Sequence, residues 1–278
     1  MGVVELDYVL PSADLQPYIS TFYRFHAAVP ALDDVERAQI AQLRFRLSPG
    51  RCFYEFADGR REDAAPFHLL GPTCGPTRVC VAGPLLVFGV GVTPAGWAAL
   101  CRSDASAMAD HVADAVPLFG DAVTQAAAAL RADGGAAAMA LAAEPFLRRL
   151  LGDGDEGAVR FVRAVDRWLE DAASPELEML IAATGLSRRQ IERRCNALYG
   201  CPPKLLARKY RALRAAVALA SGGGPIEGFY DQSHMIREVK AFTGLTPRRM
   251  REPGELARIT IDHRQALGES VGSLVSGT

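Results

Sequence analysis

Short alternating or continuously apolar stretches dominate the first 95 residues of the chain. Residues 42–47 alternate polar and apolar side chains at period two, which predicts a strand with one buried face. Residues 52–56 resume an extended pattern after a turn, and residues 79–92 are mostly β-branched and apolar. Gly89 and Gly91 lie inside this last stretch, where a glycine usually marks a bulge or a close backbone approach. The pattern predicts a mostly antiparallel β-sandwich or barrel.

From Thr93 onward the pattern becomes helical. Thr93 followed by Pro94 is typical of a helix start, and the alanine-rich residues 121–150 predict two helices separated near residues 133–135. Residues 158–169 carry an apolar stripe at helical spacing: Ala158, Phe161, Val162, Val165, Trp168 and Leu169. We therefore predict an α+β protein with three parts, of which the first two are joined by a Gly-Asp-rich linker at residues 152–157. They are a β-rich sensor or dimerisation domain with C-terminal helices (1–151), an all-α domain (158–252) and a flexible tail (253–278).

A helical hairpin is predicted within the second domain. Ser174-Pro175 is expected to begin a helix that ends at Gly185, and Ser187 is expected to cap a second helix over residues 188–198. This spacing is typical of a helix-turn-helix, whose second helix enters the DNA major groove, although an ordinary helical hairpin has the same pattern. The side chains predicted to point away from the buried stripe are Arg188, Arg189, Glu192, Arg193 and Asn196.

Charge favours the DNA-binding interpretation. The 278 residues are 49% hydrophobic and 23% charged, as in ordinary globular proteins, and the net charge is only −1. Residues 187–251, however, hold fourteen basic and four acidic side chains, a net +10, and the remainder carries −11. Such asymmetry suggests a polyanion-binding module joined to an acidic domain; a solvated basic face is the alternative.

Three segments resemble the AraC/XylS family of bacterial transcription regulators: "GLSRRQIERR", "YGCPPKLLARKYRALRAA" and "GFYDQSHMIREVKAFTGLTPRRM". They look like that family's first recognition helix, linker helix and second helix-turn-helix, and the resemblance covers about residues 158–252. It implies two helix-turn-helix units in successive major grooves, with Arg189, Glu192 and Arg193 reading bases in the first. In the second unit the matching residues are Gln232, Ser233 and Arg237.

The N-terminal part resembles the sensor domains of one branch of that family more weakly, through "LPSADLQPYISTFYRF", "LLGP" and "FGVGVTPAGWAAL". This resemblance implies a β-rich sensor followed by helices that often dimerise, and it implies no particular ligand.

The second unit departs from the family pattern. Residues 220–228 contain three consecutive glycines and a proline where the family has a scaffolding helix, and these residues disfavour a helix. Met235 and Val239 stand where the family usually has phenylalanine, as does Cys195 in the first unit. The sequence therefore predicts a shortened and under-packed second unit.

Other chemistries find little support. The five histidines are widely spaced, no phosphate-binding or nucleophile motif occurs, and we expect neither a metal, a cofactor nor an enzymatic activity. Cys74 and Cys80 are either a redox pair or two packed hydrophobic residues. Without a signal-like N-terminus, a long apolar span or a disulfide pattern, the chain is expected to be soluble and cytoplasmic, with no membrane partner.

The sequence thus predicts a DNA-binding transcription regulator that reads the major groove mainly through its first recognition helix. The alternative is a degenerate relative that pairs with or sequesters other regulators without reading DNA. Expected partners are double-stranded DNA and a second copy of the chain, with RNA polymerase and an unidentified small-molecule effector as further candidates. Phosphate contacts are expected from Ser187, Lys204, Arg208, Thr246, Arg248 and Arg249.

Overall fold

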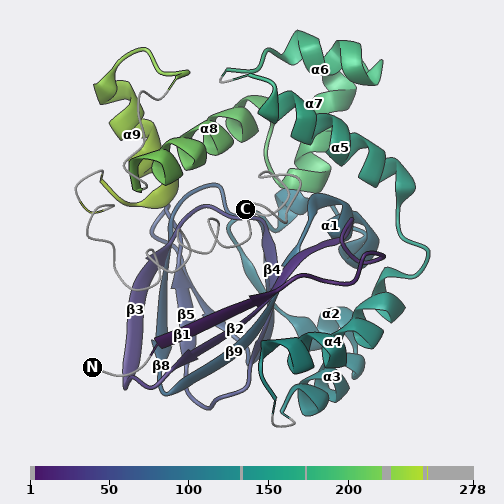
Figure 1. Ribbon diagram of the computed structural model, residues 1–278, viewed down its shortest axis with the longest axis vertical. Coiled ribbons are helices and arrows are strands. Elements are labelled where there is room, and N and C mark those ends of the chain that lie inside the picture. The colour runs from purple at the N-terminus through teal and green to yellow at the C-terminus, as the bar shows by residue number, and fades with distance from the viewer. Residues whose placement is uncertain (1–3, 132–133, 173, 221–226, 247–248, 250–278) are drawn as a thin grey trace.

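Two antiparallel sheets face each other in the N-terminal half of the computed structural model, which describes residues 4–131, 134–172, 174–220, 227–246 and 249 (Figure 1). One sheet has the strand order β1-β2-β9-β4-β7-β10 and the other β3-β8-β5-β6. The predicted β-sandwich is confirmed. The strands are β1 (Val4–Val9), β2 (Ile19–Ala27), β3 (Ala31–Glu36), β4 (Ala41–Arg46), β5 (Cys52–Glu55), β6 (Arg61–Ala64), β7 (Phe67–Leu70), β8 (Thr77–Ala82), β9 (Leu85–Val92) and β10 (Val112–Asp114).

Gly89 in β9 permits the close approach that its position in a strand predicts. It pairs with Tyr23 of β2, and a Cβ atom at Gly89 would lie only 1.9 Å from the Cζ atom of the tyrosine ring. Any side chain at position 89 would therefore displace the ring. The tyrosine lies across β9 because the glycine leaves room for it.

Strand β4 is buried on both faces, so the prediction of a half-buried strand is wrong. Leu43 and Phe45 pack in a core with two helices, α3 (Ala122–Leu130) and α4 (Ala136–Leu151), that cover the outer side of the six-stranded sheet. Arg44 and Arg46 point between the two sheets, where they are 7% and 6% exposed. The polar side of the alternating pattern thus faces an interior space instead of solvent.

The first helix, α1, begins where its cap predicts. Thr93 caps α1 (Pro94–Cys101), since its hydroxyl accepts a hydrogen bond from the Gly96 N–H at 3.0 Å. Three short elements were not anticipated: a 3₁₀ turn (Ala105–Ala107), β10 and α2 (Ala115–Phe119). Strand β10 has three residues and depends on pairing with β7, so no period-two pattern could reveal it.

Five helices follow in the C-terminal half: α5 (Glu156–Glu170), α6 (Leu177–Thr184), α7 (Arg188–Tyr199), α8 (Pro203–Ala220) and α9 (Gln232–Thr243). Helix α5 begins inside the predicted linker because Asp155 caps it. Helix α6 begins at Leu177 and not at Ser174. The Ser174 hydroxyl instead accepts a hydrogen bond from Arg211 of α8 at 2.9 Å.

The apolar stripe of α5 forms intradomain core. Phe161, Val165 and Trp168 are buried against α7 and α8, and the apolar alanine-rich surfaces of α3 and α4 are buried against the six-stranded sheet. These buried residues are therefore unavailable for a contact between two copies of the chain.

Two sequence predictions fall outside the described residues: the irregular connection at residues 221–226 and the tail at 253–278. Among the helices that the structure does describe, none combines the length and the apolar character needed to cross a membrane.

Candidate nucleic-acid interface

Helices α6 and α7 form the first predicted hairpin. Gly185 ends α6 in the left-handed conformation, with φ at +66°, and Ser187 caps α7. The cap is reciprocal, because the Ser187 hydroxyl accepts from the Gln190 N–H at 3.4 Å and the Ser187 N–H donates to Gln190 Oε1 at 2.9 Å. These contacts fix the direction in which α7 leaves the turn.

One side of α7 is core and the other is exposed. Ile191 and Cys195 are fully buried with residues of α5, α6 and α8. Position 195 is therefore closed to solvent even though cysteine is smaller than the phenylalanine usual in the family. Asn196 is half-buried, and Arg188 pairs with Glu178 of α6 at 2.6 Å. The remaining predicted base-reading residues of α7 are exposed: Arg189, Glu192 and Arg193.

The second unit presents α9 in a similar way. Asp231 caps the helix by accepting from the His234 N–H at 2.6 Å, and Gly244 ends it in the left-handed conformation. Tyr230, just before the cap, is 94% exposed and was not among the predicted site residues. Its place in the "GFYDQSH" segment is the signal that could have identified it. The predicted residues Gln232, Ser233 and Arg237 are all exposed.

A small apolar contact and an ion pair hold α9 on α8. Val239 is buried against Ala215 and Ala216. Both carboxylate oxygens of Glu238 accept from Arg208, at 2.8 and 3.0 Å. This pairing lowers the pKa of Glu238 and raises that of Arg208. Arg208, predicted to contact phosphate, therefore already has a partner within the protein.

Helices α8 and α9 are also fastened to the N-terminal domain. The ammonium of Lys209, 4% exposed, donates to the carbonyl oxygens of Gln39 at 2.8 Å and Thr73 at 2.9 Å. Burial lowers the pKa of Lys209. The Ala38 N–H donates to the carbonyl of Phe242 at 2.7 Å, and the Phe242 ring packs on Ala38. The loop between β3 and β4 thus contacts both helices.

Cys74 and Cys80, the possible redox pair of the sequence, have different neighbours in the structure. Cys74 hydrogen-bonds Cys201, which lies between α7 and α8, and this contact lowers the pKa of Cys74. Cys80 lies in β8 beside Asp33. All three cysteines are free thiols.

Part of the basic charge of α8 is therefore structural. Besides Arg208 and Lys209, Arg214 donates to the carbonyl oxygen of Leu169 at 2.7 Å, at the end of α5. Lys204, at the start of α8, is exposed. The positive charge available to a polyanion is consequently smaller than the sequence total of the segment suggests.

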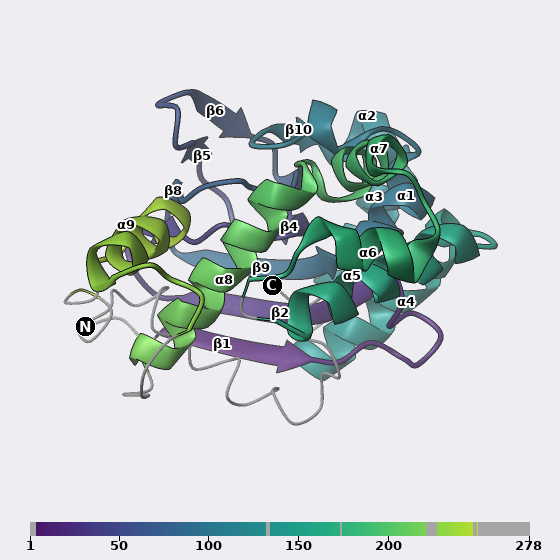
Figure 2. The same cartoon turned by 90° about the horizontal axis from the view of Figure 1, so that it is seen from above.

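The two exposed surfaces lie on opposite sides of α8 (Figures 1 and 2). In both views α9 lies on one side of α8, and α6 and α7 lie on the other. Of the remaining phosphate candidates, Thr246 is half-buried, Arg249 is exposed and Arg248 lies outside the described residues. The arrangement presents two capped helix N-termini, each with exposed polar side chains, which is the geometry that groove-binding helices use.

Comparison with known proteins identifies the second domain. Residues 180–253 match the family model described as "Helix-turn-helix domain". Solved structures of ToxT from Vibrio cholerae are similar to this chain. An apo ToxT variant has a TM-score of 0.44 at 10% identity, covering 80% of this chain and 96% of its own. The AraC-like transcriptional activator CuxR has a TM-score of 0.32 at 15% identity, covering 95% of this chain and 86% of its own. No curated protein sequence matches the chain at a significant level.

The match begins within α6, includes α7, α8 and α9, and defines the C-terminal domain as a helix-turn-helix module. Because the structural likenesses are low in identity and TM-score, this assignment rests on the family match and on the capped hairpin geometry. The domain is a helix-turn-helix domain of the AraC type, as the resemblance over residues 158–252 implied.

Proposed function

We propose that the protein is a sequence-specific DNA-binding transcription regulator that reads the major groove mainly through α7. The observation that carries this proposal is the exposed, basic N-terminal half of a capped helix whose opposite face is fully buried. A reading helix held in a rigid core loses little entropy on binding, so most of its contact energy contributes to affinity.

Base contacts are assigned to Arg189, Glu192 and Arg193, with Arg188 and Asn196 at the edge of the same surface. Arginine pairs in a bidentate way with guanine, and each such contact discriminates by roughly 1–3 kcal/mol. Helix α9 contributes Gln232, Ser233 and Arg237 in a neighbouring groove. Its weaker support by the protein makes this contribution the smaller one.

Phosphate contacts are assigned to hydroxyl and basic side chains at the starts of α7 and α8 and after the end of α9. Ser187 caps α7 and Lys204 lies in the first turn of α8. The other candidates follow α9 in the sequence: Thr246, Arg248 and Arg249. Arg208 contacts phosphate only if it gives up part of its bidentate pair with Glu238. We therefore rank it last among these residues.

A second copy of the chain and RNA polymerase are the protein partners we propose. One module gives a small footprint, and linking two modules raises affinity through effective concentration. Because the stripe of α5 is buried, a dimer contact must use other residues, such as Leu141 of α4, which is 70% exposed.

The test is selection of genomic DNA fragments by the purified full-length protein, followed by affinity measurements on enriched sites at several salt concentrations. We expect discrete sites and a log–log salt slope steeper than about −3, since each neutralised phosphate contributes about −0.9. Failure to enrich any fragment would favour the alternative of an interaction protein that does not read DNA. Enrichment of all fragments equally would contradict sequence-specific reading.

A further inference from the structure

Two thiols meet where the N-terminal domain contacts the turn between α7 and α8. Cys201 lies in this turn and is 3% exposed, and its S–H donates a hydrogen bond to the sulfur of Cys74. Cys74 lies in the loop between β7 and β8 and is half-buried, so a small molecule can reach it. The pair therefore brings together two segments that are far apart in the chain and belong to different domains.

The backbone is held in place on both sides of this contact. The Cys74 N–H donates to Asp110 Oδ1 at 2.8 Å, and Lys209 of α8 donates to the carbonyl of the residue before Cys74 at 2.9 Å. Gly200, beside Cys201, ends α7 in the left-handed conformation, and a Cβ atom there would lie 2.8 Å from Pro72 Cγ. The two segments are thus packed closely enough to keep the sulfur atoms together.

The surroundings give the two thiols different chemical characters. The hydrogen bond from Cys201 lowers the pKa of Cys74, with a further contribution from the Lys209 ammonium, and these outweigh burial and the charge of Asp110. The same hydrogen bond and burial raise the pKa of Cys201. Because the thiolate is the reactive form of cysteine, Cys74 is suited to react first and Cys201 to follow as the second thiol.

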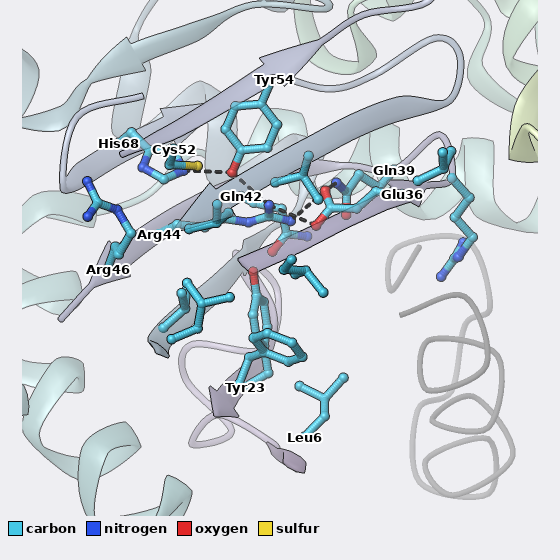
Figure 3. A pocket seen from close by; sticks show the side chains of 18 of the residues that line it. Leu6, Tyr23, Glu36, Gln39, Gln42, Arg44, Arg46, Cys52, Tyr54 and His68 are labelled. Carbon is cyan, nitrogen blue, oxygen red and sulfur yellow. Dashed lines mark hydrogen bonds and ion pairs between the residues drawn. The ribbon is translucent and has the colours of Figure 1, made fainter. Parts of the chain in front are cut away.

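The fully buried or core cysteines lack this combination. Burial raises the pKa of Cys52 to about 11 and the pKa values of Cys101 and Cys195 to about 12. Figure 3 shows Cys52 between the two sheets, beside the hydroxyl of Tyr54. A thiol in such surroundings stays protonated and is a packed hydrophobic residue.

Cys80 provides the informative contrast. It is half-buried like Cys74, so the two thiols are similarly accessible. Burial and the Asp33 carboxylate, however, raise the pKa of Cys80. Accessibility without thiolate character makes it the natural control for the reactivity of Cys74.

We propose that Cys74 and Cys201 form a redox-sensitive pair that a hydroperoxide converts into a disulfide joining the two domains. With hydrogen peroxide, the Cys74 thiolate attacks one oxygen, the O–O bond breaks, and a sulfenic acid and water form. The sulfur of Cys201 then attacks the Cys74 sulfur, and the hydroxyl leaves as water with the thiol proton. Two thiols thus lose two electrons, and the peroxide is reduced to two water molecules. Two small thiols reverse the reaction by exchange and become a disulfide themselves.

The disulfide would change how the C-terminal domain is held. Cys201 follows α7, the proposed reading helix, and precedes α8. In the reduced protein packing and hydrogen bonds fasten this turn to the N-terminal domain, whereas in the oxidised protein a covalent bond does so. This inference goes beyond the proposed DNA reading and does not depend on it.

The test treats the reduced full-length protein with one equivalent of hydrogen peroxide, followed by alkylation of the remaining thiols and peptide mapping. We expect a Cys74–Cys201 disulfide to account for most of the lost thiols. The oxidised chain should migrate faster on a denaturing gel without reductant, because the disulfide closes a large loop, and dithiothreitol should restore the original band. The proposal is overturned if no disulfide forms, or if the principal disulfide joins another pair, such as Cys195 with Cys201.

Three variants separate the roles of the thiols. Cys74→Ser should slow peroxide-driven thiol loss at least tenfold. Cys201→Ser should leave Cys74 as a sulfenic acid that dimedone traps. The matched control Cys80→Ser should oxidise like the wild type. Equal slowing by Cys80→Ser and Cys74→Ser would contradict the proposal, as would dimedone labelling of another cysteine ahead of Cys74. Mapping of the wild-type protein decides the question even where a variant does not fold, and none of these outcomes bears on the DNA-binding proposal.

Discussion

The two helix-turn-helix units differ in how the rest of the protein holds them. Helix α7 of the first unit shares a large core with α5, α6 and α8, in which Ile191 and Cys195 are fully buried. Helix α9 of the second unit meets α8 through a small cluster around Val239, and it relies on Glu238 and on Phe242 for the rest of its attachment. The first unit is therefore rigid by packing, whereas the second is held by a few contacts.

One of the contacts of α9 is with the N-terminal domain. Phe242 packs on Ala212 of α8 and also on Ala38, whose N–H donates to the Phe242 carbonyl. The position of the second reading helix consequently depends on the N-terminal domain. A loosely held element that touches another domain is well suited to respond to changes there.

The largest expected effect concerns the bases that α7 reads. Replacing Arg189 and Arg193 by alanine should reduce specific affinity by about 2–6 kcal/mol, at roughly 1–3 kcal/mol for each bidentate contact. Replacing Gln232 and Arg237 should cost less and relax preference at the outer part of the site. Both double variants are compared on one enriched site at one salt concentration.

The control is a double variant of Arg163 and Arg167, two exposed arginines of α5, because it removes the same charge as the Arg189 and Arg193 variant. If the Gln232 and Arg237 variant is the more damaging, the second unit is the principal reader and the comparison drawn here is reversed.

Next in size is the attachment of α9 to the N-terminal domain. Phe242→Ala removes a buried ring and should destabilise the docked α9 by about 3 kcal/mol, the lower end for loss of a phenylalanine. Hydrogen exchange should then accelerate in α9 and remain slow in α7. Equal acceleration in both helices would mean that the two units unfold together.

A smaller effect is expected from the ion pair. Glu238→Gln should weaken the docking of α9 by about 1 kcal/mol, because Arg208 is partly exposed and its pairing is screened. Since the folded protein lowers the pKa of Glu238, its contribution is fully present above the ordinary pKa of a glutamate and is lost as the pH falls through the lowered value. Exchange in α9 should therefore rise on acidification in the wild type, and this added rise should be missing in Glu238→Gln.

The smallest effects come from the helix caps, where the same change is made in both units. Ser187→Ala and Asp231→Ala should each cost about 1 kcal/mol. In the absence of DNA, loss of the Ser187 cap should lower the Tm without fraying α7. Loss of the Asp231 cap should instead fray the first turn of α9, visible as faster exchange of the His234 amide. Fraying of α7 to the same extent would contradict the difference in rigidity.

Much of the fold and of the proposed DNA-binding surface could be predicted from the sequence, because both depend on local patterns. The period-two strands, the caps at Thr93 and Ser187, the glycine at position 185 and the stripe of α5 all determine nearby backbone and side-chain directions. The proposed reading residues of α7 and α9 follow from helical spacing and from the family signature, and they are exposed except for the half-buried Asn196.

Tertiary structure decided what local patterns leave open, namely which partner each charged side chain meets. The pattern Gln42-x-Arg44-x-Arg46 looks like the solvent side of a strand, and only the packing of α3 and α4 on the other face turns it into the lining of a cavity. Likewise, the sequence of α8 gives a basic helix, but contacts with residues far along the chain assign Arg208 to Glu238 and Lys209 to the carbonyls of Gln39 and Thr73. Sequence periodicity sets the face on which a side chain lies, whereas its charge acts on whatever the folded chain brings to that face.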